Sequence, residues 1–263
     1  SFFHLGRPER AWRSAARWRT SWMSREVIVL PAFMASVAAW GLLHFMGWKP
    51  VLFTLGDSFP VDLSLLVGAV STVLCFALFL CTGMIYACIK MLQEWATPWT
   101  VINYTLLGWA SGFTLVTGFA AYQGSVQTGF FGAWAIILTV LALIGRSASL
   151  VRNARLKPKS TMETAIGVRH SRIEQKAQGA MGGSFNTREY FHGASNRKYK
   201  NIKWLFLLLV FPVPLVLLAG GLVTASSALL LLAFLVQYAG LVLERWFFFA
   251  QANHPQNLYY QTV

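Results

Sequence analysis

The chain has 263 residues, of which 56% are apolar and only 12% are charged, against ~25% in an ordinary soluble domain. Its mean hydropathy is +0.53. Several apolar runs exceed the ~20 residues that a helix needs to cross a bilayer, and the ~10-residue alternating segments typical of a β-barrel are not found. The composition therefore excludes an ordinary soluble domain and predicts an all-α, polytopic transmembrane helix bundle.

Six apolar spans make up most of the chain, and residues 1–263 are predicted to form a single membrane-anchor domain. In chain order the predicted spans are Glu26–Trp48, Ser64–Met91, Thr100–Ala121, Gly129–Leu150, Ile202–Leu222 and Ser226–Ala250. The chain starts without a methionine, and an apolar pair directly precedes His4. We interpret this start as the end of an earlier helix that would begin before Ser1, rather than as a signal peptide.

The basic residues divide unevenly between the two sides of the membrane. If residues 1–25 lie on one side, alternation through six spans places all but one of the 22 Lys and Arg residues there, Lys49 being the exception. The positive-inside rule makes this side cytoplasmic. The net charge of +13 therefore reflects orientation in the membrane and not nucleic-acid binding. The longest basic segment, 151–200, is predicted to be a cytoplasmic loop, either a partly ordered docking loop or a solvated linker.

Residues 7–24 are predicted to form a basic helix that lies on the membrane surface. Pro8 suits a first helical position, Trp18 and Trp22 recur along one face, and Arg10 belongs to the opposite, basic face. Tryptophan at headgroup level with arginine facing phosphate is typical of an interfacial helix. The alternative is a plain basic anchor without a ligand role.

Two titratable residues, His4 and Glu26, flank this basic segment at one water–lipid boundary. A histidine titrates near neutral pH, and burial raises the pKa of a carboxyl group. The pair therefore suits a lipid-soluble molecule that gains or loses protons together with electrons. The alternative is a glutamate that merely reaches water at the end of its span.

Three further side chains on the same side are candidates. Tyr104 lies one turn inside its span and could reach a headgroup, although bonding across helices is the more common role. Glu244 forms a polar stripe with Gln237 and Gln251 at i, i+7 and i+14. A carboxylate inside a membrane is a functional candidate by default, and its alternative is an ion pair with an arginine of another helix. His254, in the segment after the last span, is predicted to lie at the same membrane boundary as His4.

No metal or haem site is predicted. The three cysteines lie in one apolar segment without a Cys-x-x-Cys spacing, so we interpret them as buried, inert thiols. A haem within the membrane needs two histidines on helices, and only His44 lies inside a predicted span. Nucleotide-binding and catalytic-triad motifs do not occur.

Three short motifs resemble the membrane-anchor subunit family of dimethyl sulfoxide reductase. They are His4–Leu5–Gly6–Arg7–Pro8, Arg10–Ala11 and Ser24–Arg25–Glu26. The family pattern is His-Leu-Gly-x-Pro-x-Arg-Ala followed by Ser-x-Glu at the next span, and the spacing of 22 residues from His4 to Glu26 matches it. The family has eight spans, so two would precede Ser1. The run Glu244–Arg245–Trp246 supports the resemblance.

The resemblance implies a three-part complex in the bacterial inner membrane. A molybdopterin catalytic subunit and a four-cluster iron–sulfur subunit would lie on one membrane face, and the anchor would bind quinone without carrying a redox metal. By resemblance, His4 and Glu26 are quinone-site residues and Arg10 matches a motif arginine. His4 would hydrogen-bond a quinone carbonyl and donate a proton, Glu26 would exchange protons with the cytoplasm, and Arg10 would stabilise charge on the quinol anion.

The predicted orientation is similar to one branch of the family. In the dimethyl sulfoxide reductase itself the motif face looks to the periplasm, whereas here that face is strongly basic and hence cytoplasmic. This arrangement resembles the branch that serves cytoplasm-facing sulfite dehydrogenases, in which electrons run from sulfite to quinone. Three alternatives stay open: a quinol-oxidising anchor of a terminal reductase, a purely structural anchor, and a transporter or proton channel, which would predict inverted repeats.

Overall fold

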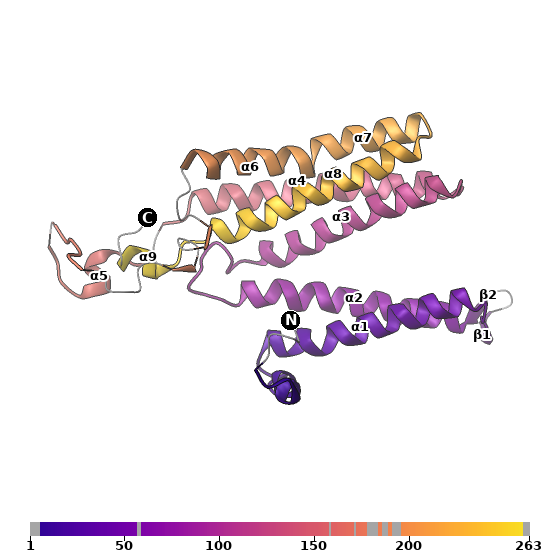
Figure 1. Ribbon diagram of the computed structural model, residues 1–263, viewed down its shortest axis with the longest axis horizontal. Coiled ribbons are helices and arrows are strands. Elements are labelled where there is room, and N and C mark those ends of the chain that lie inside the picture. The colour runs from indigo at the N-terminus through magenta and orange to yellow at the C-terminus, as the bar shows by residue number, and fades with distance from the viewer. Residues whose placement is uncertain are drawn as a thin grey trace. The chain divides into compact units, whose positions relative to one another are not determined.

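Figure 1 shows the computed structural model of the chain, which describes residues 6–56, 59–157, 159–170, 172–177, 184–185, 189–190 and 196–259. The chain forms two compact units, Ser1–Tyr86 and Ala87–Val263. Each unit is mostly helical, which confirms the predicted all-α class. His4 lies outside the described residues, so its predicted role stays a prediction.

Unit 1 opens with the basic segment. A 3-10 helix, η2 (Pro8–Ala15), begins at the proline that the sequence marks as a first helical residue. The α-helix α1 (Trp22–Phe45) starts after an intervening turn, and the Ser21 hydroxyl caps it by accepting the Ser24 N–H at 3.4 Å. The segment predicted as one helix over 7–24 therefore consists of a 3-10 helix, a turn and the first residues of α1.

The second helix of unit 1, α2 (Leu63–Ala87), runs antiparallel to α1. Two side-chain contacts join the pair near its two ends: Thr82 contacts Glu26, and Ser64 contacts His44. The segment that connects α1 to α2 forms a short antiparallel hairpin of β1 (Val51–Leu55) and β2 (Phe59–Asp62). The sequence analysis did not predict this hairpin, because two strands this short carry too little periodicity to stand out between apolar helices.

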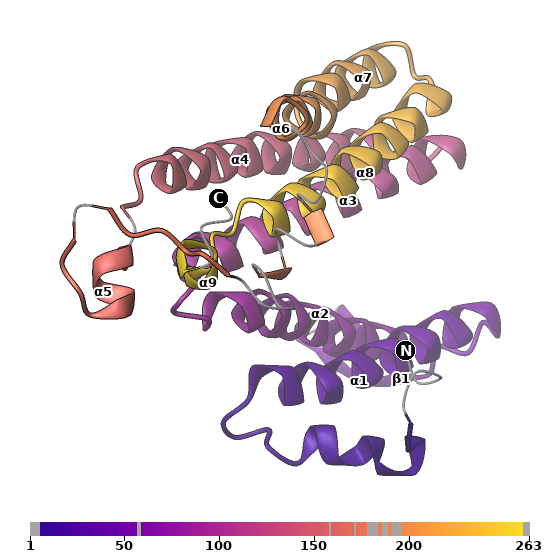
Figure 2. The same cartoon turned by 60° about the vertical axis from the view of Figure 1, so that its left-hand side comes forward.

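Unit 2 is a bundle of longer helices with two short helices at its basic end. Figures 1 and 2 show α3, α4, α6, α7 and α8 lying side by side. The elements are α3 (Pro98–Tyr122), α4 (Thr128–Ala154), α5 (Met162–Ile166), α6 (Asn196–Val210), α7 (Pro212–Val223), α8 (Ser227–Ala250) and α9 (Pro255–Tyr259). Because α4 and α6 extend beyond the spans predicted for them, the loop that joins them is shorter than the predicted segment 151–200.

The fifth predicted span is interrupted at Phe211, between α6 and α7. The two prolines that follow, Pro212 and Pro214, lack the amide hydrogen that a continuous helix needs. The bend that the sequence predicts at these prolines therefore coincides with the observed break.

Five helical segments are long and apolar enough to cross a membrane: Trp22–Phe45, Leu63–Ala87, Thr128–Ala154, Arg197–Val223 and Ser227–Ala250. They account for five of the six predicted spans. The sixth, predicted over 100–121, coincides with α3, a helix of 25 residues. Its buried residues include Thr100, Asn103, Thr114 and Thr117. These polar side chains lower the hydropathy of α3, which is not among the five segments apolar enough to cross a membrane.

The core of unit 2 lies where α3, α4, α6 and α8 meet, around the buried side chains Leu107, Ala142, Phe206, Val210, Phe211 and Phe247. A glycine brings α6 and α8 unusually close, because a Cβ at Gly240 would lie 2.8 Å from the Leu209 carbonyl carbon and the Val210 nitrogen. Small residues at such crossings are a common means of close helix packing in membranes. This close contact holds α8, which carries Glu244, against its neighbours.

Candidate functional site

Glu26 lies near the start of α1 in unit 1 and has a partner on α2. The Thr82 hydroxyl donates a hydrogen bond of 2.6 Å to Glu26 Oε1, and the glutamate is half-buried. The sequence analysis named Glu26 but missed Thr82, because no pattern relates two residues 56 positions apart. A short hydrogen bond to a carboxylate fixes its orientation and is worth about 1.5–3 kcal/mol.

The basic segment is tied to the same end of α1 by Arg25. Its Nε and one terminal nitrogen each donate a hydrogen bond of 2.8 Å, to the carbonyl oxygens of Trp18 and Arg19. Its guanidinium carbon lies 4.1 Å from the ring centroid of Trp22, a cation–π contact. Arg10 belongs to η2 and lies exposed, with Nε 4.0 Å from Glu9 Oε1. The basic segment is therefore held at the start of α1, the helix that carries Glu26.

In unit 2, Glu244 is completely buried and paired with two arginines. Its Oε1 lies 2.8 Å from Nε of Arg146, on α4, and its Oε2 accepts a 2.6 Å hydrogen bond from Nε of Arg245, its own neighbour on α8. The guanidinium of Arg245 in turn lies over the ring of Tyr104, 5.2 Å from its centroid. The structure therefore brings the predicted residues Tyr104 and Glu244 together through an arginine that the sequence analysis had not assigned to the site.

This buried cluster carries an excess of positive charge. Two guanidinium groups share one carboxylate, and Arg146 is only 2% exposed. Among the described residues, Arg146 Nη2 and the Asn103 side-chain oxygen are buried without a hydrogen-bond partner. A buried pair with spare polar atoms is costly unless water or a ligand satisfies them. The cluster can therefore attract a group that gains negative charge.

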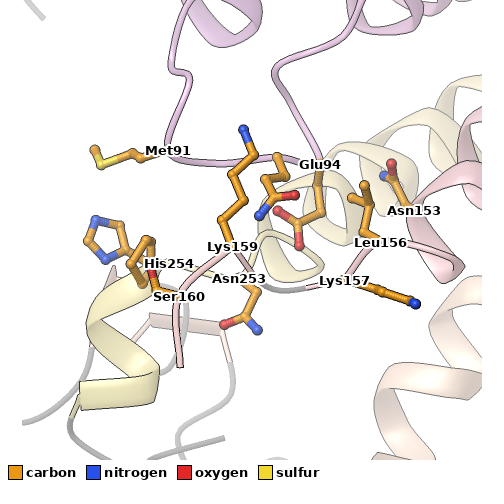
Figure 3. Close-up of a pocket in the computed structure, with 11 residues that line it drawn as sticks. Met91, Glu94, Asn153, Leu156, Lys157, Lys159, Ser160, Asn253 and His254 are labelled. Atoms are coloured by element: carbon orange, nitrogen blue, oxygen red, sulfur yellow. The ribbon is translucent and has the colours of Figure 1, made fainter. Parts of the chain in front are cut away.

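His254 borders a cavity of about 250 Å³ at the basic end of unit 2 (Figure 3). Its wall comes from three segments: the loop before α3, the end of α4 with the residues after it, and the residues after α8. His254 Nδ1 accepts the backbone N–H of Gln256 at 3.1 Å. In the neutral imidazole the hydrogen therefore lies on Nε2, which leaves that nitrogen as the donor.

The same cavity contains a carboxylate that the sequence analysis missed, Glu94. Burial raises the pKa of the Glu94 carboxyl, although the backbone N–H groups of Glu94 and Asn253 and the guanidinium of Arg152 oppose the shift. Glu94 Oε2 is buried and has no hydrogen-bond partner in the described part of the chain. In sequence Glu94 resembles any solvated loop residue, and only the fold reveals that three segments enclose it.

Unit 1 has a larger cavity of about 690 Å³ at the end opposite Glu26. Its wall is mainly apolar and includes Phe33, Val37 and Trp40. His44, the one histidine inside a predicted span, has Nε2 2.7 Å from the Ser64 hydroxyl and its ring 4.7 Å from that of Trp40. His44 thus has a hydroxyl partner and an aromatic neighbour in this cavity.

The cysteines and acidic residues do not form a metal site in the part of the chain that the structure describes. Within those ranges, no three His, Cys, Asp or Glu residues lie close enough together to hold a metal ion. All three cysteines were predicted to be buried, but only Cys81 is: Cys75 is partly buried and Cys88 is exposed. The expectation of an anchor without a redox metal of its own stays a prediction.

Comparison with known proteins gives two matches. Residues 1–260 match the family model described as DMSO reductase anchor subunit (DmsC). The chain is also 57% identical over 263 residues to a sulfite dehydrogenase subunit of Allochromatium vinosum, and this alignment covers 100% of the chain and 81% of the relative. No solved structure matches.

Proposed function

The chain belongs to the DMSO reductase anchor subunit family, and we propose that it is the quinone-binding membrane subunit of a heterotrimeric molybdopterin oxidoreductase that oxidises sulfite. The observation that carries the proposal is the 57% identity to a subunit of a sulfite dehydrogenase, which extends over every residue of the chain. The membrane-spanning helices make it an integral membrane protein. Its basic face is proposed to be the cytoplasmic face of the inner membrane.

The proposed reaction divides between the subunits. Sulfite and water give sulfate, two protons and two electrons at the molybdopterin subunit, and the electrons pass through the four clusters of the iron–sulfur subunit. Quinone, the lipid-soluble substrate of this chain, takes up those two electrons and two protons to become quinol. This chain must therefore bind quinone near the membrane surface and deliver protons to it.

Glu26 fits that task by its position and its surroundings. It lies near the start of a membrane helix, beside the exposed apolar side chains of Val27 and Ile28, which a substrate in lipid can reach. Its hydrogen bond to Thr82 holds the carboxyl in one orientation. We assign Glu26 to proton exchange, His4 to a quinone carbonyl, and Arg10 to the negative charge that develops on reduction.

Tyr104, Glu244 and His254 are proposed as a second group of quinone-site residues, contributed by unit 2. The excess positive charge at Glu244 favours an electron-rich ring, and the Tyr104 hydroxyl is a hydrogen-bond donor. His254 can donate a hydrogen bond from Nε2. His4, Arg10 and Glu26 belong to unit 1, whereas Tyr104, Glu244 and His254 belong to unit 2. Substitutions in one unit therefore test its group of residues separately from the other.

The family and the exposed basic residues indicate which subunits this chain binds. Exposed cations such as Arg172 and Lys176 lie in the loop between α4 and α6. They would attract an acidic docking surface of the iron–sulfur subunit, and the molybdopterin subunit would bind beyond it. The family match also removes the basis for the transporter alternative, since it covers nearly the whole chain.

The test is sulfite-dependent quinone reduction by the purified complex. Glu26→Gln and His4→Ala should each lower turnover by about 100-fold, the lower end of what a positioned proton-transfer group contributes. Glu163→Gln removes an exposed carboxylate from α5 and serves as the matched control. Normal turnover by both site variants in an intact complex would rule out the assignment in unit 1.

A further inference from the structure

Polar residues recur at matching positions along α4 and α8. Three pairs can be formed, each with one residue from α4 and one from α8 or its C-cap: Thr139 with Gln237, Arg146 with Glu244, and Asn153 with Gln251. The two members of each pair are 98 residues apart in sequence. Successive pairs are seven residues apart on both helices, which is about 10.5 Å along a helix axis. α4 and α8 are therefore parallel along this seam, and polar groups recur on it every two turns.

The first two pairs are in contact. Gln237 Nε2 lies 3.3 Å from the Thr139 hydroxyl, and Arg146 Nε lies 2.8 Å from Glu244 Oε1. The third pair lies where the two helices end. There the amide nitrogens of Asn153 and Gln251 are both buried, and neither has a hydrogen-bond partner among the residues described.

The third pair leads to the cavity that contains Glu94. Asn153 lines that cavity together with Glu94 (Figure 3). Arg152, beside Asn153, donates a 3.1 Å hydrogen bond to the carbonyl oxygen of Gln93, the neighbour of Glu94. The last turn of α4 thus connects the seam to the loop that carries the carboxylate.

Several polar atoms between the cavity and Glu244 are buried and unpartnered within the described ranges: Glu94 Oε2, Asn153 Nδ2, Gln251 Nε2 and Arg146 Nη2. Buried polar atoms in proteins are almost always hydrogen-bonded, and ordered water is the usual partner where protein groups are absent. In an apolar surrounding each such atom left bare would cost roughly 1–3 kcal/mol. Bound water that satisfies these atoms would connect the cavity to Glu244.

We propose that Glu94 is the proton-entry group of a hydrated path that follows α4 and α8 from the cavity to Glu244. The proposal rests on the proposed function, because quinone reduction is the process that consumes the protons. In each transfer, a hydronium ion in the cavity gives a proton to the Glu94 carboxylate and becomes water. The carboxylic O–H bond then breaks as the proton passes inward to bridging water. Protons that take this path reach Glu244, which belongs to the group of residues that unit 2 is proposed to contribute to the quinone site.

The charged and titratable groups near Glu94 come from four parts of the chain: Arg152 at the end of α4, Lys157 and Lys159 after it, His254 after α8, and Tyr199 on α6. The guanidinium of Arg152 favours the Glu94 carboxylate, while burial favours the acid. Because burial raises the pKa of Glu94, the group can be protonated closer to neutral pH than an exposed glutamate. Its acid form becomes scarce as pH rises through that pKa, so wild-type turnover should fall on the alkaline side.

The experiment compares Glu94→Gln, Glu94→Asp and the control Glu163→Gln in the purified complex. We expect Glu94→Gln to lower quinone reduction by about 100-fold, to remove the alkaline fall in the pH profile, and to leave the affinity for a quinone analogue within about twofold. Glu94→Asp should restore part of the rate, since it keeps a carboxyl group. Asn153→Leu, which removes an unpartnered amide from the path, should also slow turnover without weakening analogue binding.

A second readout does not depend on turnover. Infrared spectra recorded against pH should contain the carbonyl band of a protonated carboxyl that Glu94→Gln lacks and Glu163→Gln retains. An unchanged rate and pH profile in Glu94→Gln would overturn the proposal. Loss of analogue binding in that variant would also overturn it, because Glu94 would then be a binding residue. If the wild-type complex binds no quinone analogue, the proposed function itself fails and this path fails with it.

Discussion

At the scale of single residues, the buried carboxylate of Glu244 pairs with two arginines in unit 2. The i, i+7 spacing of polar residues on α8 predicted that Glu244 faces the bundle, and its burial confirms this. The partner Arg146 could not be predicted, because it lies on another helix, 98 residues away, and reaches Glu244 only in the folded bundle. Glu94 was missed for the same reason, since its enclosure depends on three separate segments.

The shared carboxylate predicts unequal effects of removing its partners. Glu244→Gln leaves two guanidinium groups without a counter-charge and should destabilise the protein by about 3–5 kcal/mol, as expected for a broken buried pair. Arg146→Gln leaves Glu244 paired with Arg245 and should cost less. Thermal unfolding of both variants in detergent measures the difference. Equal losses, or a larger loss for Arg146→Gln, would contradict this account of the cluster.

The contact between Thr82 and Glu26 gives a prediction about activity. Thr82→Val keeps the shape of the side chain but removes the 2.6 Å hydrogen bond to the carboxylate. We expect kcat for quinone reduction to fall by about tenfold, a loss of about 1.4 kcal/mol, while Thr82→Ser keeps most of the rate. Separate measurement of kcat and KM checks this. A change confined to KM would assign Thr82 to substrate binding instead.

At the scale of secondary-structure elements, the sequence predicts the long helices well and the short elements poorly. Long apolar runs identify the spans, and Pro212 and Pro214 mark the break between α6 and α7. The hairpin of β1 and β2 and the 3-10 form of η2 depend on a few local hydrogen bonds, which leave little trace in composition. Their local geometry therefore had to come from the structure.

The close crossing of α6 and α8 predicts that two glycines differ in tolerance. Gly240→Ala would place a Cβ 2.8 Å from α6 backbone atoms, so the helices must separate, at a cost of about 1–3 kcal/mol. A Cβ at Gly220, on α7, would meet nothing within 4 Å, so Gly220→Ala should leave stability unchanged or slightly higher. Detergent unfolding of the two variants provides the comparison. If Gly220→Ala lowers stability more than Gly240→Ala does, the close crossing of α6 and α8 does not limit which residue position 240 can hold.

At the scale of the whole molecule, charge predicts how the protein lies in the membrane. Lys49 follows α1, whereas Lys176 lies in the loop between α4 and α6, and both are exposed. In a Cys88→Ser background, Lys176→Cys should react with an impermeant thiol reagent only from the cytoplasm, and Lys49→Cys only from the opposite side. The reverse labelling would invert the proposed topology and place the partner subunits outside the cytoplasm.

Sulfite-dependent reduction of the quinone pool in inverted membrane vesicles tests the central claim most directly, because sulfite then meets the cytoplasmic face. Vesicles that contain the complex should reduce quinone when sulfite is added, Glu26→Gln vesicles should lose about 99% of that rate, and Glu163→Gln vesicles should keep it. An undiminished rate in vesicles that retain the catalytic and iron–sulfur subunits but lack this chain would contradict its role as the quinone-binding subunit.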